Sequence, residues 1–277
     1  MRKHERRLFC DISPTCFKIS LQKEIFLRHI KNLLSRVKFA KTKETEPLPN
    51  VVFQYHSELI KRGKGIDPQL QENKATNIRL AGSKIDHLII RPGEVFSFWK
   101  TVGKVTRRKG YLDGRVIEGK TLTAGLGGGL CNLGNTIHYL VLHSPLEVVE
   151  FHSHSDALAP EHGERIPFSS GTSVRYNHVD YRFRNNTDQK VQLLVWCDQE
   201  KLYGELRSEA EFPWRYELLE EEHCFRKEGE QYFRHSKIYK LTRDRETNAI
   251  LEKRLVLKNH SKVMYDYDQI PKELIHQ

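Results

Sequence analysis

Three adjacent glycines precede a cysteine at the point where a helix is predicted to begin. They are Gly127, Gly128 and Gly129, and a single leucine separates them from Cys131. Adjacent glycines are costly to order and pack nothing, so they indicate a sharp bend or a close backbone approach. A helix start offers N–H groups and a positive dipole end, which favour a thiolate. Cys131 is therefore a candidate nucleophile. The glycines and Asn132 are candidate contacts for a substrate or its oxyanion.

A thiol nucleophile also needs a base within hydrogen-bonding distance. His138 lies on the same predicted helix, ~10 Å further along its axis, which is too far. His152 and His154 share one face of the strand predicted next, and a strand returning beside the helix start would bring one of them to the sulfur. Asp180 or Asp156 would then orient that imidazole, as the third group of a catalytic triad does.

The same two histidines allow a different chemistry. Their spacing on a strand, His152-x-His154, suits two imidazole ligands, and Cys131 or His162 would complete an open zinc site. The chain then would be a metal-dependent hydrolase. The cysteines form no CxxC pair, and the sequence predicts no resident metal or cofactor.

Each of these features also has a structural explanation. A lone cysteine is usually a small buried hydrophobe, and glycines can simply permit a tight turn. The glycines do not form a phosphate-binding P-loop, because Cys131-Asn132 stands where Gly-Lys-Ser/Thr is required. No helix-turn-helix, zinc-finger or RNP pattern supports nucleic-acid binding. A non-catalytic binding or scaffold protein is therefore the main alternative to a thiol hydrolase or transferase.

Composition narrows the class of protein and its surroundings. The chain has 277 residues and a formal net charge of +10, which favours anionic partners. It contains no run of ~20 apolar residues that would span a bilayer. The N-terminal residues lack the apolar core and cleavage site of a secretory signal. Five widely spread cysteines, an odd number, indicate a reducing, cytoplasmic compartment.

The elements that must position these residues form an α+β protein with a mixed or antiparallel sheet packed on a few helices. We expect a basic helical leader over residues 1–47, an α+β core over 48–210 and a β-hairpin extension over 211–277. The leader has apolar residues at helical spacing from Leu21 to Phe39, with lysine and arginine on the other face. Such a helix either packs on its own domain or lies on a membrane surface.

Within the core, apolar spacing predicts a helix from Ala75 through Ile89, ended by Arg91-Pro92-Gly93. A second helix follows the glycines and ends at Pro145. The predicted strands cover 94–99, 114–118 and 146–154, then a hairpin of 174–183 with 191–196, then two or three antiparallel strands from Arg215 with turns near 228–230 and 244–248.

Five short motifs in this order resemble the VanW family. They are RPGEVFSF at 91–98, GY at 110–111, GGGLC at 127–131, HSHS at 152–155 and DYRFRNNT at 180–187. The resemblance covers about residues 72–205. It implies an accessory role in glycopeptide (vancomycin) resistance or cell-envelope metabolism, with a cell-wall-related peptide or precursor as the ligand. It implies a setting rather than a particular reaction.

Two positions depart from the family pattern. Asn132 stands where the family usually has glutamine, and Gly171-Thr172 stands where it usually has Asp-Ala before the last hairpin. In an enzymatic version, Cys131 would be the nucleophile and His154 or His152 the base. If the replaced aspartate belonged to an active site, this chain would be impaired.

Overall fold

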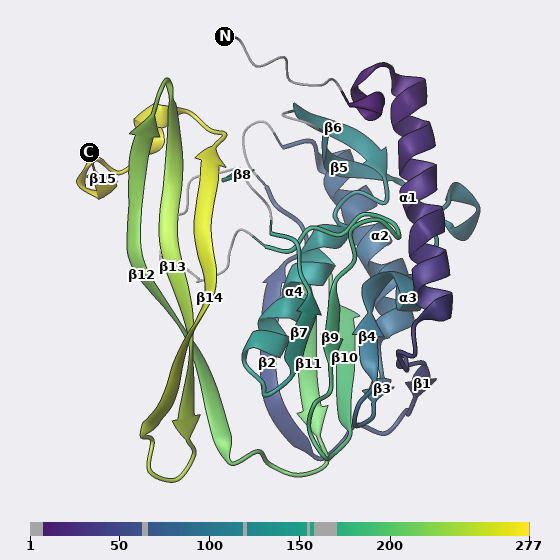
Figure 1. The fold of residues 1–277 in the computed structure, drawn as a ribbon, viewed down its shortest axis with the longest axis vertical. Helices are drawn as coiled ribbons and strands as arrows, with labels where there is room; N and C mark the ends of the chain where they lie inside the picture. The colour runs from purple at the N-terminus through teal and green to yellow at the C-terminus, as the bar shows by residue number, and fades with distance from the viewer. Residues whose placement is uncertain (1–7, 63–65, 119–120, 154–155, 158–170, 277) are drawn as a thin grey trace.

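The computed structural model describes residues 8–62, 66–118, 121–153, 156–157 and 171–276. A body of helices and short sheets stands beside a long, twisted antiparallel sheet, and the N-terminal helix covers the outer side of the body (Figure 1). The predicted α+β class with a β-rich C-terminal part is confirmed. The boundaries predicted near residues 48 and 210 stay predictions.

The α-helices of the described ranges are α1 (Pro14–Leu34), α2 (Pro68–Ile85), α3 (Phe98–Val102) and α4 (Leu130–Leu142). The first two share a start signal, a capping side chain followed by proline. The Ser13 hydroxyl accepts from the Cys16 N–H at 3.1 Å, and the Asp67 carboxylate accepts from the Gln69 N–H at 2.8 Å. Proline suits the first helical position because no intrahelical bond is lost there. Short 3-10 turns lie at Phe9–Asp11, Arg107–Lys109, Tyr267–Gln269 and Lys272–Leu274.

The central sheet is antiparallel, with strands in the order β1-β3-β10-β11-β2. Its strands are β1 (Thr42–Lys43), β2 (Asn50–Glu58), β3 (Leu88–Ile90), β10 (Val191–Cys197) and β11 (Lys201–Ser208). A smaller sheet, in the order β4-β9-β7, joins β4 (Val95–Ser97), β7 (Glu147–Glu150) and β9 (Arg182–Arg184). A hairpin of β5 (Asp113–Glu118) and β6 (Thr121–Leu126) leads to the glycines before α4.

The C-terminal sheet has the order β15-β12-β13-β14-β8. Its strands are β8 (Asp156–Ala157), β12 (Trp214–Glu228), β13 (Gln231–Asp244), β14 (Ile250–Val263) and β15 (Ile275–His276). The turns between the three long strands fall where the sequence predicts them. The sheet also includes a strand from outside the predicted extension, because β8 pairs in parallel with β14.

The main hydrophobic core lies between the helices and the central sheet. Helix α2 packs on β10, α4 packs on β11 and β2, and the two helices touch each other. Ile78, Ile85, Leu133, Ile137 and Leu206 are fully buried there. Burial of one such side chain contributes about 1.5–3 kcal/mol. The N-terminal end of α4 is therefore held on a rigid support.

Two predicted elements are wrong, both for tertiary reasons. The helix does not continue through Ile89. It ends at Ile85, His87 adopts a positive φ of 63°, and the next three residues form β3. A short, fully buried strand has no alternation, so its apolar residues extend a helical pattern equally well.

The hairpin predicted around Asn185 does not form either. Strand β9 pairs with β4 and β7, whereas β10 pairs with β11 and β3. The Asn185 amide nitrogen donates to the carbonyl oxygens of Ile90 and Gln189, at 2.8 Å each. The turn therefore carries the chain from one sheet to another instead of folding it back.

Candidate functional site

At each of the three glycines before α4, a side chain would clash with a neighbouring segment of the chain. Gly127 and Gly129 have positive φ angles of 76° and 98°. A Cβ on Gly128 would lie 2.2 Å from the carbonyl carbon of Gly114, and one on Gly129 would lie 2.3 Å from Cγ of Lys74. The run thus passes the backbone of β5 and the side chain of Lys74 on α2 at distances that exclude a Cβ atom. This close approach explains the glycines by packing alone.

An asparagine on α2 holds this crossing in place. The Asn77 amide nitrogen donates to the carbonyl oxygens of Gly128 and Leu112 at 3.0 Å each, and its amide oxygen accepts from the Leu112 N–H at 2.8 Å. Asn77 is fully buried. The sequence did not predict this role, because a single asparagine among the other polar residues of α2 gives no distinctive signal.

The thiol of Cys131 has the opposite electrostatics to those predicted. Its Sγ accepts from the Val174 N–H at 3.5 Å and donates to the Val174 carbonyl at 3.7 Å. The residue keeps some exposure, yet burial of the thiol raises its pKa, and the Val174 N–H and the charge of Arg175 offset this only in part. The N–H of Cys131 at the helix start also lowers the pKa, as expected, but burial outweighs it, so the pKa of the thiol is raised overall.

Of the predicted bases, His152 lies within the described residues, and its side-chain partner there is Glu150 rather than the Cys131 sulfur. The imidazole of His152 is 44% exposed, and its Nε2 lies 3.2 Å from Oε1 of Glu150. His154, His162 and the side chain of Asp156 lie outside the described residues. The Cys–His pair and the alternative zinc site therefore stay predictions.

Both the nitrogen and the oxygen of the Asn132 side-chain amide hydrogen-bond to β2, which holds α4 against that strand. Its amide nitrogen donates to the Glu58 carbonyl at 3.2 Å, and its amide oxygen accepts from the Ser57 hydroxyl at 3.2 Å. The Ser57 hydroxyl is also 3.2 Å from that of Thr136, on the next turn of α4. This structural role accounts for the residue without a ligand.

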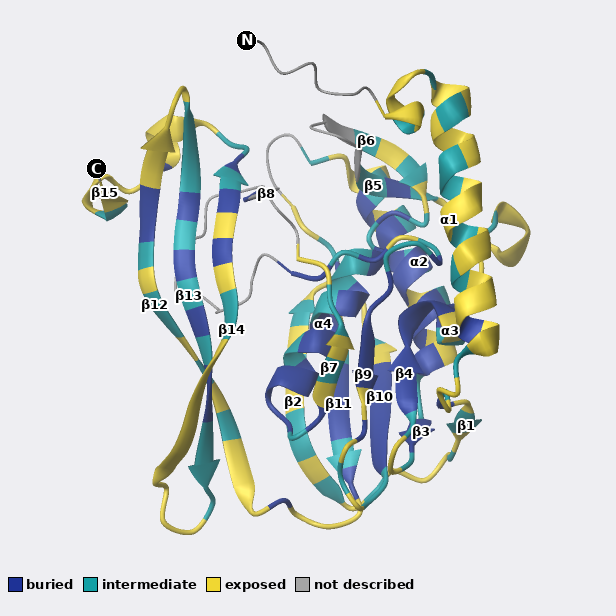
Figure 2. Cartoon of the chain, in the orientation of Figure 1, coloured by how far each residue is buried: buried dark blue, intermediate teal, exposed yellow. Residues whose placement is uncertain are grey.

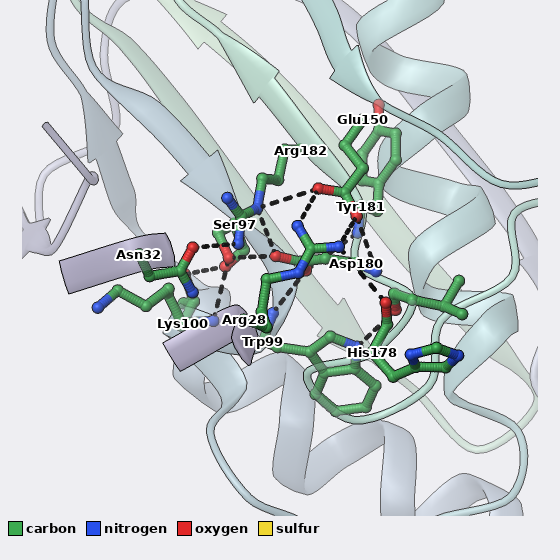
Figure 3. Close-up of polar contacts among 12 residues, drawn as sticks. Arg28, Asn32, Ser97, Trp99, Lys100, Glu150, His178, Asp180, Tyr181 and Arg182 are labelled. Carbon is green, nitrogen blue, oxygen red and sulfur yellow. Dashed lines mark hydrogen bonds and ion pairs between the residues drawn. The ribbon is translucent and has the colours of Figure 1, made fainter. Parts of the chain in front are cut away.

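Asp180 is fully buried at the centre of a polar network (Figure 3). Its carboxylate accepts from the Ser97 hydroxyl and the Arg182 Nε, at 2.6 Å each. It also accepts from the N–H groups of Trp99 and Tyr181, at 3.0 Å each. These four donors account for both oxygens, and none of them is an imidazole. Asp180 thus joins α3, β4 and β9.

The same network fastens α1 to the body. The guanidinium of Arg28 forms a bidentate pair with Glu150, with both N–O distances 2.7 Å. The Asn32 amide oxygen accepts from Arg182 at 2.9 Å (Figure 3). Burial opposes ionisation of Glu150, but hydrogen bonds from Arg28 and His152 and the charges of both arginines lower its pKa. We call Arg28, Asn32, Glu150 and Arg182 the α1 latch.

Basic side chains gather near the glycines and the start of α4. Lys74, on α2, is 8% exposed, contacts the position of Gly129, and its Nζ donates to the Glu58 carbonyl at 3.4 Å. Burial lowers its pKa to about 8, and the charges of Lys61 and Arg115 lower it further while Glu58 opposes them. No described side chain caps the N-terminus of α4.

Two cavities lie away from the start of α4. One of about 280 Å³ lies between β2 and the start of β12, where Phe53, His143 and Trp214 line it. The Phe53 and His143 rings stack there at 3.8 Å, and burial lowers the pKa of His143 to about 4. Cys131 does not line this cavity.

Comparison with known proteins identifies the central part of the chain. A family model described as "VanW like protein" matches residues 73–207, from α2 to β11. These residues are a VanW-like domain. The resemblance to the VanW family is therefore confirmed.

Two relatives agree with this assignment. The chain is 27% identical over 227 residues to the vancomycin B-type resistance protein VanW of Enterococcus faecalis, which covers 82% of each chain. It is 31% identical over 120 residues to the uncharacterized protein YoaR of Bacillus subtilis, covering 43% of this chain and 38% of the relative. No solved structure matches the chain. The glycines, Cys131 and Asp180 lie inside the VanW-like domain, whereas α1 and most of the C-terminal sheet lie outside it.

The packing of the glycines predicts a strong size limit at Gly128. Gly128→Ala should lower the free energy of unfolding by about 1–3 kcal/mol, because the added methyl meets backbone that cannot rotate away. Gly82→Ala is the matched control, since the nearest atom to its Cβ is a valine methyl at 3.3 Å. Chemical denaturation of both variants tests this. Equal stability of the two would contradict the close approach of Gly128 to Gly114.

The lowered pKa of Glu150 predicts a pH-dependent latch. Because the folded pKa lies below the ordinary 4.5, the stabilisation is full above that pH and is lost as pH falls through the folded pKa. Glu150→Gln should cost about 2 kcal/mol at pH 7 and progressively less below pH ~4.5. Denaturation curves from pH 7 to 3 measure this. Glu147→Gln, on the same strand in an exposed pair with Arg184, should change stability by less than about 0.5 kcal/mol.

Proposed function

We propose that this protein is an accessory protein of glycopeptide resistance or cell-envelope metabolism that binds a cell-wall-related peptide or precursor. The E. faecalis relative is named a vancomycin B-type resistance protein, which supports this setting. The observation that carries the binding proposal is the electropositive start of α4, inside the VanW-like domain.

An anionic group fits the start of α4 better than a neutral one. A helix N-terminus stabilises a nearby negative charge by about 0.3–1 kcal/mol, and more when the site is partly buried. Here no described side chain caps the helix, and Lys74, Lys61 and Arg115 add positive charge. The free carboxylate at the end of a short cell-wall peptide has the matching charge.

The contacts favour binding over thiol catalysis. A protonated, buried thiol is a weak nucleophile, and the three glycines and Asn132 are accounted for by packing. The alternative remains a thiol hydrolase or transferase with Cys131 as nucleophile and His154 or His152 as base. In that enzyme, the second ring nitrogen of His152, or His154, would have to reach the sulfur.

Calorimetric titration with a synthetic stem peptide bearing a free C-terminal carboxylate tests the binding proposal. Lys74→Met should weaken binding about tenfold, equivalent to ~1.4 kcal/mol, and capping the peptide as its amide should do the same. Lys84→Met is the control, because Lys84 is an exposed lysine on the same helix. Equal affinity for carboxylate and amide would overturn the proposal.

Substitution of Cys131 distinguishes the binding proposal from the enzymatic alternative. In the binding version, Cys131→Ala keeps the peptide affinity of the wild-type protein. In the enzymatic version, mass spectrometry shows peptide turnover by the wild-type protein and its loss in Cys131→Ala.

We also propose that the protein acts from the cytoplasmic side, at a membrane surface, through α1. The side of α1 opposite the latch exposes Ile19, Phe26, Ile30 and Leu33, which the 3.6-residue period places on one face (Figure 2). Exposed lysines surround this stripe: Lys18, Lys23 and Lys31. An apolar stripe with basic flanks complements an anionic lipid surface. No helix in the described ranges is long and apolar enough to cross a bilayer.

Sedimentation with lipid vesicles tests the contact through α1. The protein should bind vesicles containing anionic lipid and bind purely zwitterionic ones much more weakly, since both apolar and electrostatic contributions are needed. The double variant Phe26→Ser with Leu33→Ser should lose at least about tenfold in vesicle affinity. Leu251→Ser, a similarly exposed leucine on β14, is the control. Self-association through α1 without vesicle binding would refute this proposal.

A further inference from the structure

Three potential metal ligands converge on one face of the C-terminal sheet, outside the VanW-like domain. They are Glu228 at the end of β12, His235 on β13 and His260 on β14, and one ligand atom of each lies within 4.8 Å of the others. His235 and His260 are directly opposite each other in the strand register. Three separate strands thus present one side chain each to a common point.

The separations are close to those of a metal centre. Oε1 of Glu228 lies 3.0 Å from Nε2 of His235 and 3.0 Å from Nε2 of His260. Tetrahedral zinc, with bonds of about 2.0–2.2 Å, places neighbouring ligand atoms roughly 3.3–3.5 Å apart. Small side-chain rotations, with no change in the backbone, would therefore admit the ion.

The environment orients the imidazoles and leaves room for further ligands. The Phe233 ring stacks on that of His260, with centroids 4.5 Å apart and planes 1° apart, which restrains the imidazole. The side chains of Glu228 and His260 are 44% and 52% exposed, so water can complete the coordination. Arg226 and Lys262 pair with Phe233 in the strand register. Their positive charges would weaken the binding of a cation.

We propose that Glu228, His235 and His260 bind a borderline divalent transition-metal ion, with Zn²⁺ as the representative ion. Two imidazole nitrogens and one carboxylate oxygen suit such ions, whereas Mg²⁺ and Ca²⁺ prefer oxygen ligands. One ion would fasten the β12–β13 turn to β14 and cross-link the three long strands. In the absence of metal, the same groups form an ion pair when a histidine is protonated.

Competition with a chromophoric chelator, on the tag-free full-length protein at pH 7.5, tests the site with Zn²⁺. The wild-type protein should bind one equivalent, and His235→Ala, His260→Ala and Glu228→Gln should each weaken that binding by at least about 100-fold. His56→Ala is the control, because His56 is an exposed histidine on β2 beside Lys201. Circular dichroism verifies that each variant is folded.

Co²⁺ gives an independent measurement of the ligand set. The wild-type protein should show the visible absorption of a four- or five-coordinate nitrogen and oxygen site, and the three variants should lose it. Either of two results would overturn the proposal: no stoichiometric Zn²⁺ binding by the folded wild-type protein, or binding that survives all three substitutions.

Discussion

The buried carboxylate of Asp180 is the constraint around which the body is organised. A charge removed from water is tolerated only when it is paired and its oxygens accept hydrogen bonds. Here the donors come from α3, β4 and β9, so these elements must all be in place together. Arg182, drawn in by Asp180, in turn contacts Asn32, and Glu150 accepts from the Asp180 N–H at 3.3 Å. The network thus extends from the core to α1.

The start of α4 illustrates how one structure can serve both packing and binding. Gly128 and Gly129 let the chain cross α2 and β5, and this crossing brings Lys74 beside the helix terminus. A buried lysine is stable only with nearby acceptors, which the Glu58 carbonyl supplies. The packing that requires glycine therefore also concentrates positive charge. An anion-binding role and a structural role for these residues are compatible.

The sequence correctly predicted those elements that depend on residues close together in the chain. The helix after the glycines, the stop before Pro145 and the turns of the C-terminal strands all depend on neighbouring residues. Pairings between distant segments were not predictable: the Arg28–Glu150 pair spans 122 residues, and β2 was not foreseen. Asp180 and Asn132 were singled out by type and spacing, but their partners are set by tertiary packing. The pKa of the Cys131 thiol was not predictable for the same reason. Its burial is set by tertiary packing, and that burial outweighs the effect of the helix terminus.

Glu150 links the latch to the candidate base. Its carboxylate accepts hydrogen bonds from both terminal nitrogens of Arg28, and its Oε1 also contacts Nε2 of His152. A carboxylate that holds one imidazole nitrogen leaves the other nitrogen able to take a proton, as in a catalytic triad. In the described residues, however, the Cys131 thiol hydrogen-bonds to Val174 and not to His152. Loss of the Arg28 contacts would strengthen the hold of Glu150 on His152, since the carboxylate would have fewer donors. Docking of α1 and the orientation of the His152 imidazole are therefore coupled through a single side chain.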